Sequence, residues 1–169
     1  RLFIGFKQGH LVYLDYEDDD FIEIETDTIS NIEDLEIEVG YNFAILISNL
    51  KVMALDLGTG DHFVNGNTTL YEGSRLVYSE PVKSIIAGGN PHVSAGNVYK
   101  YQLTPNSIDF AGHSGIGGYV DDLFLNPNNK DLLVTTDHYN NGYPAYDITN
   151  FFAFLGKYEL FHSNTATYN

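Results

Sequence analysis

Clusters of acidic side chains are the first residues of this sequence that could take part in a reaction. The densest is Glu17-Asp18-Asp19-Asp20, and a second pair is Asp121-Asp122. A glycoside hydrolase needs two carboxyl groups at a fixed separation across the bond that it cleaves. Carboxylate oxygens also bind calcium, so Asp18, Asp19 and Asp20 are the candidate metal ligands, although the run lacks the glycine and the distal glutamate of an EF-hand loop. A turn in contact with water is the favoured interpretation of this cluster.

Histidines are the next candidates for metal binding or proton transfer. The six are His10, His62, His92, His113, His138 and His162, and none stands in a His-x-His or His-Glu-x-x-His spacing. Such spacings bring two imidazoles to one zinc ion. His10 and His138 each fall in a loop between predicted strands and could approach one another on one face, but a third ligand is lacking. We therefore expect hydrogen-bonded or exposed loop histidines and no metal catalysis.

The run Gly112-His113-Ser114-Gly115-Ile116-Gly117-Gly118 is similar to two enzymatic motifs. It departs from the Gly-x-Ser-x-Gly nucleophile motif at Ile116, and it lacks the lysine and the following helix of a phosphate-binding loop. Glycine tolerates the backbone angles that a sharp crossing between two structural units requires. We expect this run to be a flexible link between two repeats.

A loop rich in aromatic and amide side chains, residues 136–143, is a candidate for binding. Planar rings supply contact area and amides supply directional hydrogen bonds, which suits a carbohydrate or a protein surface. A long loop in contact with solvent alone is the alternative. The candidate ligand-binding residues, which lie in loops expected on one face, are His10, Asn49, Asn97, His113, His138, Tyr139, Asn140 and Tyr143, with Gln8 beside them.

Charge and composition restrict the classes of function. The 169 residues include 8 basic and 23 acidic ones, for a formal net charge of −15. A surface this negative repels nucleic-acid phosphates and anionic lipid head groups, so we expect neither nucleic-acid binding nor membrane insertion. The sequence contains no cysteine, which excludes a disulfide framework, a thiolate metal site and a thiol nucleophile.

The elements that must position these residues are predicted to be strands. Tyr and Phe are frequent, at 13 and 11 residues, and no segment shows an apolar stripe at the helical period. Four apolar strands each end at an acidic or amide anchor. The anchors Asp15, Asp56, Gln102 and Asp147 are spaced 41, 46 and 45 residues apart. A period of about 40–50 residues indicates propeller blades or another repeat array.

Each repeat is expected to hold four strands, in units approximately at residues 1–29, 30–81, 82–117 and 118–169 of a single domain. The opening strands are expected at 32–37, 82–87 and 120–125, and the anchors end the third strands. In the segment 120–125, Asp121 or Asp122 points inward only if the strand is twisted or bulged. Residues 65–81, which contain a strand-like segment at 74–78, are interpreted as an insertion. A spare strand at 157–162 would either close the first unit or begin a further one.

The segment Val52-Met53-Ala54-Leu55-Asp56-Leu57-Gly58-Thr59-Gly60 resembles the strand and turn of quinoprotein-like propeller repeats, in which an apolar-Ala-Leu-Asp-x-x-Thr-Gly run closes the third strand. The resemblance implies an all-β propeller-like array of about four four-stranded blades, alone or as part of a larger propeller. Those repeats usually carry a tryptophan after the turn, and this sequence has none. We therefore expect no quinone. No other cofactor is predicted, and calcium at Asp18, Asp19 and Asp20 stays open.

Repeats and aromatic loops without a convergent acid, base, nucleophile or metal set indicate a non-catalytic binding or assembly module. Its partner would be a protein or carbohydrate surface, and its setting extracellular or on a surface appendage or viral particle. The alternative is a glycan-processing enzyme with carboxylates in a central funnel. A funnel lined by two or three carboxylates would favour the enzyme, and a flat aromatic face would favour assembly.

Overall fold

A computed structural model describes residues 2–5, 11–15, 20–24, 31–38, 40–59, 61–64, 70, 74–88, 97–115, 119–126, 131–137, 143–149 and 153–158. Nearly all of these residues are in or between β-strands, and the described helical structure is one 3-10 turn at Glu80–Val82. Within these ranges no helix is long and apolar enough to cross a membrane. The expectation of an all-β chain is confirmed.

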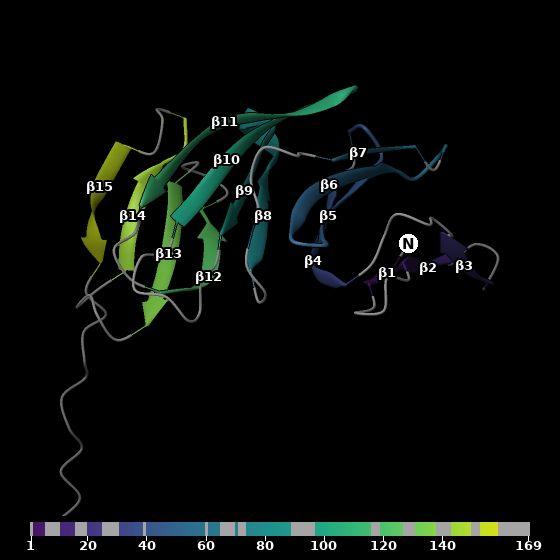
Figure 1. Ribbon diagram of the computed structural model, residues 1–169, viewed down its shortest axis with the longest axis horizontal. Helices are drawn as coiled ribbons and strands as arrows, with labels where there is room; N and C mark the ends of the chain where they lie inside the picture. Colours follow the sequence, from purple (N-terminus) through teal and green to yellow (C-terminus); the bar gives the residue numbers. More distant parts are fainter. Residues whose placement is uncertain are drawn as a thin grey trace, which may run out of the picture.

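The described strands form four antiparallel sheets, which follow one another along the chain (Figure 1). The first has the order β1-β2-β3, and the others are β4-β5-β6-β7, β11-β10-β9-β8 and β12-β13-β14-β15. Their bounds are β1 Leu2–Gly5, β2 Leu11–Asp15, β3 Asp20–Ile24, β4 Ile32–Glu38, β5 Phe43–Ser48, β6 Lys51–Asp56, β7 His62–Val64, β8 Arg75–Ser79, β9 Ser84–Gly88, β10 Asn97–Thr104, β11 Ser107–Gly115, β12 Tyr119–Leu125, β13 Asp131–Asp137, β14 Tyr143–Asp147 and β15 Ala153–Tyr158.

The sheets stand side by side and bury apolar residues between their faces (Figure 1). Neighbouring residues of β9 show the pattern: Ile85 packs in the cluster shared with the second sheet, and Ile86 in the cluster shared with the fourth. The six residues of β5 are likewise all buried. In such strands apolar residues follow one another without alternating with polar ones, because both faces of a middle sheet are covered by neighbouring sheets.

One edge strand of each of the last three sheets lies toward a common interior. These strands are β4, β8 and β12, and β8 contacts both of the others. Because each is an edge strand of its sheet, one side of its backbone has no strand of that sheet to pair with. The surface that these three strands share is therefore where side chains from different repeats meet.

Two of the anchor residues end their strands by capping a turn. The Oδ1 atom of Asp56 accepts the backbone N–H groups of Gly58 at 2.7 Å and Thr59 at 3.1 Å. The same atom of Asp147 accepts the N–H of Thr149 at 2.8 Å. A carboxylate that bonds the backbone two or three residues ahead holds a tight turn, which is why aspartate recurs at this position.

The third anchor, Gln102, has a different role. Its Nε2 donates to the carbonyl of Lys83 at 2.9 Å, in the turn between β8 and β9. A backbone bond from the residue after the anchor reaches that same turn, from Leu103 N to Lys83 O, as Leu57 N does to Asn42 O in the second sheet. Lys83 and Asn42 both have a positive φ, of 49° and 61°. The two repeats therefore share this turn geometry although their anchors differ.

The strand assignment of the third repeat is corrected by the structure. Its first strand is β8, in the segment that the sequence pattern marked as an insertion, and the expected first strand at 82–87 overlaps the second strand, β9. The third sheet thus begins at Arg75, ahead of the expected boundary at residue 82. The sequence also predicts a second strand of this repeat at residues 92–95, which lie outside the described residues.

Two further expectations about connecting segments change. Gly112 to Gly115 belong to β11 and form no flexible link, while residues 116–118 lie outside the described ranges. Lys157 and Tyr158, expected to open a spare strand, are the last residues of β15, where they pair with Pro144 and Tyr143. Residues 159–162 are not described.

Candidate functional site

The residues predicted to bind a ligand are distributed over three sheets. Asn49 lies in the turn between β5 and β6, Asn97 begins β10, His113 lies within β11 and Tyr143 begins β14. Of these four, the pairing of β10 with β11 brings Asn97 and His113 close together. Asn97 is opposite Gly115, and Tyr99 is opposite His113. The residues His10, His138, Tyr139 and Asn140, with Gln8, lie outside the described part of the chain.

Around His113 the structure forms an aromatic ladder, made of Tyr99, Tyr101, Phe110 and His113 on β10 and β11. Ring centroids are 6.1 Å apart for Tyr99 and His113 and 6.0 Å apart for Tyr101 and Phe110. Phe110 and His113 stack, with centroids 6.5 Å apart and ring planes inclined by 23°. These separations are in the range of favourable aromatic contacts, so the four rings form one connected surface.

A β-bulge creates this ladder. Phe110 and His113 are three residues apart, so in a regular strand they would point to opposite faces. The register shifts between Lys100 and Tyr101, so that Tyr101 pairs with Phe110 and Lys100 with Gly112. The extra residue in β11 restores both rings to the face that carries Tyr99 and Tyr101. Gly112 has a φ of 151°, a backbone angle that glycine tolerates and other residues rarely adopt.

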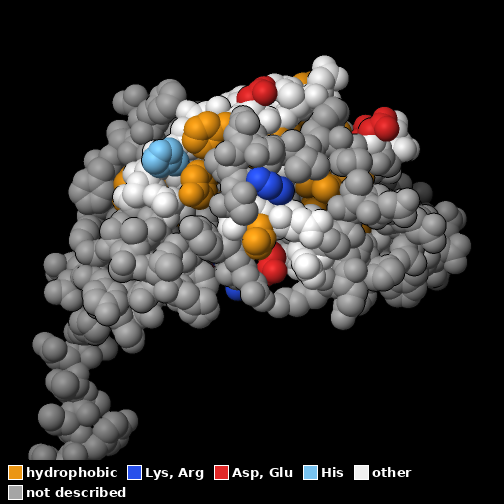
Figure 2. Space-filling view, in the orientation of Figure 1, with side chains coloured by type: hydrophobic (Ala, Val, Ile, Leu, Met, Phe, Trp, Pro, Cys, Tyr) orange, Lys and Arg blue, Asp and Glu red, His pale blue; other side chains and the backbone are white. Residues whose placement is uncertain are grey.

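The ladder runs from the core to the surface. Tyr101 is fully buried between the second and third sheets, Tyr99 is partly buried, and Phe110 and His113 are exposed. Phe110 is 38% exposed, one of two large hydrophobic side chains described as exposed. Figure 2 shows a histidine among hydrophobic side chains on the face that carries β10 and β11. A ligand stacked there would bury aromatic area that the fold itself leaves in water.

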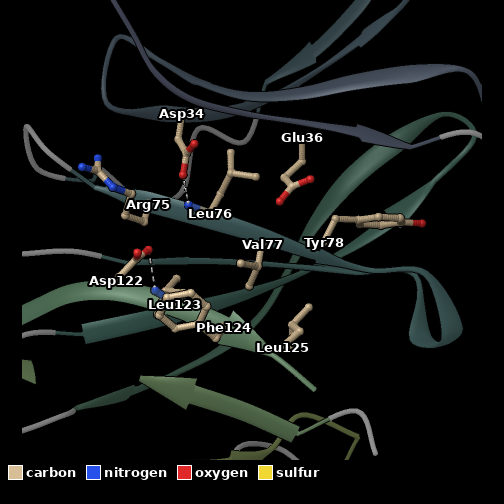
Figure 3. Close-up of a pocket in the computed structure, with 10 residues that line it drawn as sticks. All are labelled: Asp34, Glu36, Arg75, Leu76, Val77, Tyr78, Asp122, Leu123, Phe124 and Leu125. Atoms are coloured by element: carbon tan, nitrogen blue, oxygen red, sulfur yellow. Dashed lines mark hydrogen bonds between the residues drawn. The ribbon is translucent and has the colours of Figure 1, made fainter. Parts of the chain in front are cut away.

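A second candidate site is a groove between the first strands of three sheets, here called the inner-strand groove (Figure 3). Its volume is about 500 Å³, within the range of small-ligand sites. Its lining comes from β4, β8 and β12, and consists of Asp34, Glu36, Arg75, Leu76, Val77, Tyr78, Asp122, Leu123, Phe124 and Leu125. Sequence reasoning missed the four residues of β8, because that strand was interpreted as an insertion.

Two of the three carboxylates in the inner-strand groove bond backbone groups. Asp34 Oδ2 accepts Leu76 N of the next sheet at 2.8 Å, and its Oδ1 accepts Leu35 N at 3.0 Å. Asp122 Oδ1 accepts Leu123 N at 2.9 Å. The register of strand pairing shifts just before each aspartate, between Ile32 and Asp34 in β4 and between Val120 and Asp122 in β12. The register shift meets the condition under which Asp121 or Asp122 would point inward, and Asp122 lines the groove.

The third carboxylate, Glu36, reaches from β4 toward β8 in Figure 3. Glu36 is an exposed residue of β4. Its partial burial, and then the negative charge of Asp34, raise its pKa above the ordinary value. Phe124 on the opposite strand is 51% exposed. The groove therefore combines negative charge with an exposed aromatic ring.

No metal centre is found in the part of the chain that the structure describes. No group of three or more His, Asp or Glu side chains there could hold a metal ion. Of the calcium candidates, Asp20 is the first residue of β3, and Asp18 and Asp19 lie outside the described residues. The calcium hypothesis therefore stays a prediction.

Comparison with known proteins supports the fold. The chain is similar to a proposed 6-phosphogluconolactonase from Bacteroides uniformis, with a TM-score of 0.63 and 18% identity over 87% of this chain and 47% of that one. It is also similar to a chain of a mitotic checkpoint complex, with a TM-score of 0.58 and 13% identity over 78% and 41% of the two chains. A third match is tricorn protease, with a TM-score of 0.57 and 17% identity over 90% and 15%.

These similarities define a propeller-like all-β fold. The chain spans less than half the length of each of the three chains that it matches. No family model and no curated protein matches the sequence.

Proposed function

We propose that this chain is a non-catalytic binding module that holds a carbohydrate against the aromatic ladder. The observation that carries the proposal is the bulge in β11, which places Phe110 and His113 side by side on an exposed face. Exposed stacked rings cover the apolar face of a sugar ring, and a nearby amide such as Asn97 bonds its hydroxyl groups. An extracellular or particle-surface setting stays a prediction.

The use of the carboxylates favours binding over catalysis. A glycosidase needs one carboxyl group that donates a proton and a second that acts as base or nucleophile. Asp34 instead accepts two backbone N–H groups, and Asp122 accepts one. Such bonds hold the side chain in place, which suits a structural role.

The glycan-processing enzyme remains the second candidate, because three carboxylates do line the inner-strand groove. The similarity to a proposed 6-phosphogluconolactonase adds a lactone to the substrates worth testing. A phosphorylated lactone would need cations around its phosphate group. Among the ten residues that line the groove, Arg75 is the single cation, so a phosphorylated substrate fits it poorly.

A glycan array followed by calorimetry on the best binder tests the proposal. Phe110→Ala and His113→Ala should each weaken binding about tenfold, which is the effect of losing about 1.4 kcal/mol at a central aromatic contact. Phe124→Ala is the matched control, because it removes the other phenylalanine that is exposed among the described residues, in the groove. It should leave binding unchanged.

Equal binding by the wild-type protein and the Phe110→Ala variant would contradict the ladder as the site. Release of reducing sugar or hydrolysis of a lactone, abolished by Glu36→Gln, would favour the enzyme instead. A protein ligand that depends on Phe110 and His113 would retain the surface and replace carbohydrate as its partner.

A further inference from the structure

We infer that the inner-strand groove is a second binding site, which takes the arginine side chains of an extended basic segment of a partner protein. This inference does not depend on the proposed carbohydrate site, because the groove shares no residue with the aromatic ladder.

The first argument is charge. Among the residues drawn in Figure 3, the carboxylates of Asp34, Glu36 and Asp122 outnumber the guanidinium of Arg75 by three to one. The chain as a whole carries a formal net charge of −15. A cationic segment is therefore attracted from a distance and again within the groove, whereas an anionic one is repelled.

The second argument is the apolar part of the lining. Val77 of β8 is partly buried, and Phe124 of β12 is 51% exposed. An arginine side chain has an apolar stem that packs on such a wall, and its planar guanidinium stacks on an aromatic ring. A compact metal ion or a free ammonium would use the carboxylates but would leave this wall uncovered.

The third argument comes from the Glu36 carboxylate. Its pKa is raised by lost hydration and by the charge of Asp34, so ionised Glu36 is less favourable here than in water. A guanidinium placed near both carboxylates would offset that repulsion and form charge-assisted hydrogen bonds. The groove volume of about 500 Å³ accommodates a side chain of this size.

The probe for this inference is acetyl-triarginine amide, titrated into the protein at low ionic strength and followed by calorimetry and by chemical shifts of β4, β8 and β12. Acetyl-tricitrulline amide is the matched control, since citrulline keeps the shape of arginine without its charge. We expect saturable binding of the arginine peptide alone, and weaker binding at about 0.15 M salt because exposed charges are screened there.

Three variants in the groove, with Phe110→Ala outside it as the control, should separate the contributions. Glu36→Gln and Phe124→Ala are each expected to weaken binding about fivefold to tenfold, while Phe110→Ala on the aromatic ladder leaves it unchanged. Arg75→Gln should strengthen binding, because it removes the cation that competes in the groove. A gain of affinity in that variant cannot arise from misfolding.

Failure of the arginine peptide to bind would overturn the inference. So would equal binding of the citrulline peptide, or spermidine binding as tightly with the same dependence on Glu36, which would indicate a site for small amines. A neutral oligosaccharide that shifts the groove resonances in place of the peptide would also overturn it. The peptide and spermidine outcomes do not bear on the carbohydrate site, which Phe110→Ala tests separately.

Discussion

Asp34 of the second sheet accepts the backbone N–H of Leu76 in the third sheet at 2.8 Å, and so joins two repeats at their inner edges. Leu76 is 3% exposed, and its N–H group lies on the edge strand β8. A buried N–H group that loses its partner costs about as much as a lost hydrogen bond, and more when the acceptor was charged. This single carboxylate therefore contributes to cohesion between sheets.

Replacing the Asp34 carboxylate should weaken the contact between the second and third sheets and so lower the stability of the protein. We expect Asp34→Ala to lower the free energy of unfolding by about 2 kcal/mol, because two bonds to a charged acceptor disappear. Denaturant unfolding measures the effect. Asp109→Ala, at an exposed carboxylate in the β10–β11 hairpin, is the control and should change stability by less than about 0.5 kcal/mol. Equal effects of the two changes would contradict the proposed link.

A second link between the same sheets is the ion pair of Glu38 and Lys83, whose Oε1 and Nζ atoms are 3.0 Å apart. The Glu38 side chain has no exposed area, and it also accepts the N–H groups of Gly40 and Tyr41. Removing one partner of such a pair leaves an uncompensated buried charge, whereas removing both does not. Lys83→Met should therefore melt at a lower temperature than the double variant Glu38→Gln/Lys83→Met.

Differential scanning calorimetry of the two variants makes that comparison. Both retain a side chain at position 83 with its positive φ of 49°, so backbone strain is the same in each. A double variant that melts below Lys83→Met would show that lost contacts, and not the unpaired carboxylate of Glu38, cause the effect.

The aromatic ladder should depend on the glycine in the bulge. Gly112 has a φ of 151°, so Gly112→Ala strains the backbone there by about 1–3 kcal/mol or forces the bulge to move. If the bulge moves, Phe110 and His113 no longer share a face, and nuclear Overhauser contacts between their rings disappear. Gly115→Ala is the matched control, because its Cβ would meet the Oδ1 of Asn97 at an ordinary 3.6 Å. Retention of the ring contacts in Gly112→Ala would contradict this account.

Strand identity was predictable from the sequence where apolar runs and turn residues coincide. The first and third strands of the second sheet fall where the repeat pattern placed them, and Asp56 caps the turn that follows the third one. β8 was missed because the apolar pattern placed the first strand of this repeat at residues 82–87. The structure has the end of a 3-10 turn, Glu80–Val82, and the strand β9 there, and β8 pairs with β9 from the other side of that turn. Local patterns identify strands, but pairing decides their position in a sheet.

The candidate sites were less predictable, because bulges set which side chains share a face. His113 and Asn97 were selected as loop residues, whereas the structure has both within strands. Phe110 was not selected, and in a regular strand it would point to the other face of the sheet from His113. The one-residue register shift brings the Phe110 and His113 rings to the same face. The sequence signal of this shift is Gly112, but a glycine is equally typical of a flexible link.

The pH dependence of stability tests the inner-strand groove without a ligand. Because the pKa of Glu36 is raised, the folded protein holds this proton more tightly than the unfolded chain does. Ionised Glu36 therefore costs stability at pH 7, and the cost disappears as the pH falls through the folded-state pKa toward the ordinary value of 4.5. The Glu36→Gln variant should melt at a higher temperature than the wild-type protein at pH 7, and the difference in melting temperature should disappear near about pH 4.

Glu80→Gln is the control of opposite sign, because the bond from Lys83 lowers the pKa of Glu80. That variant should melt below the wild type at pH 7 and approach it in acid, and the same sign of change in both variants would contradict the assignment.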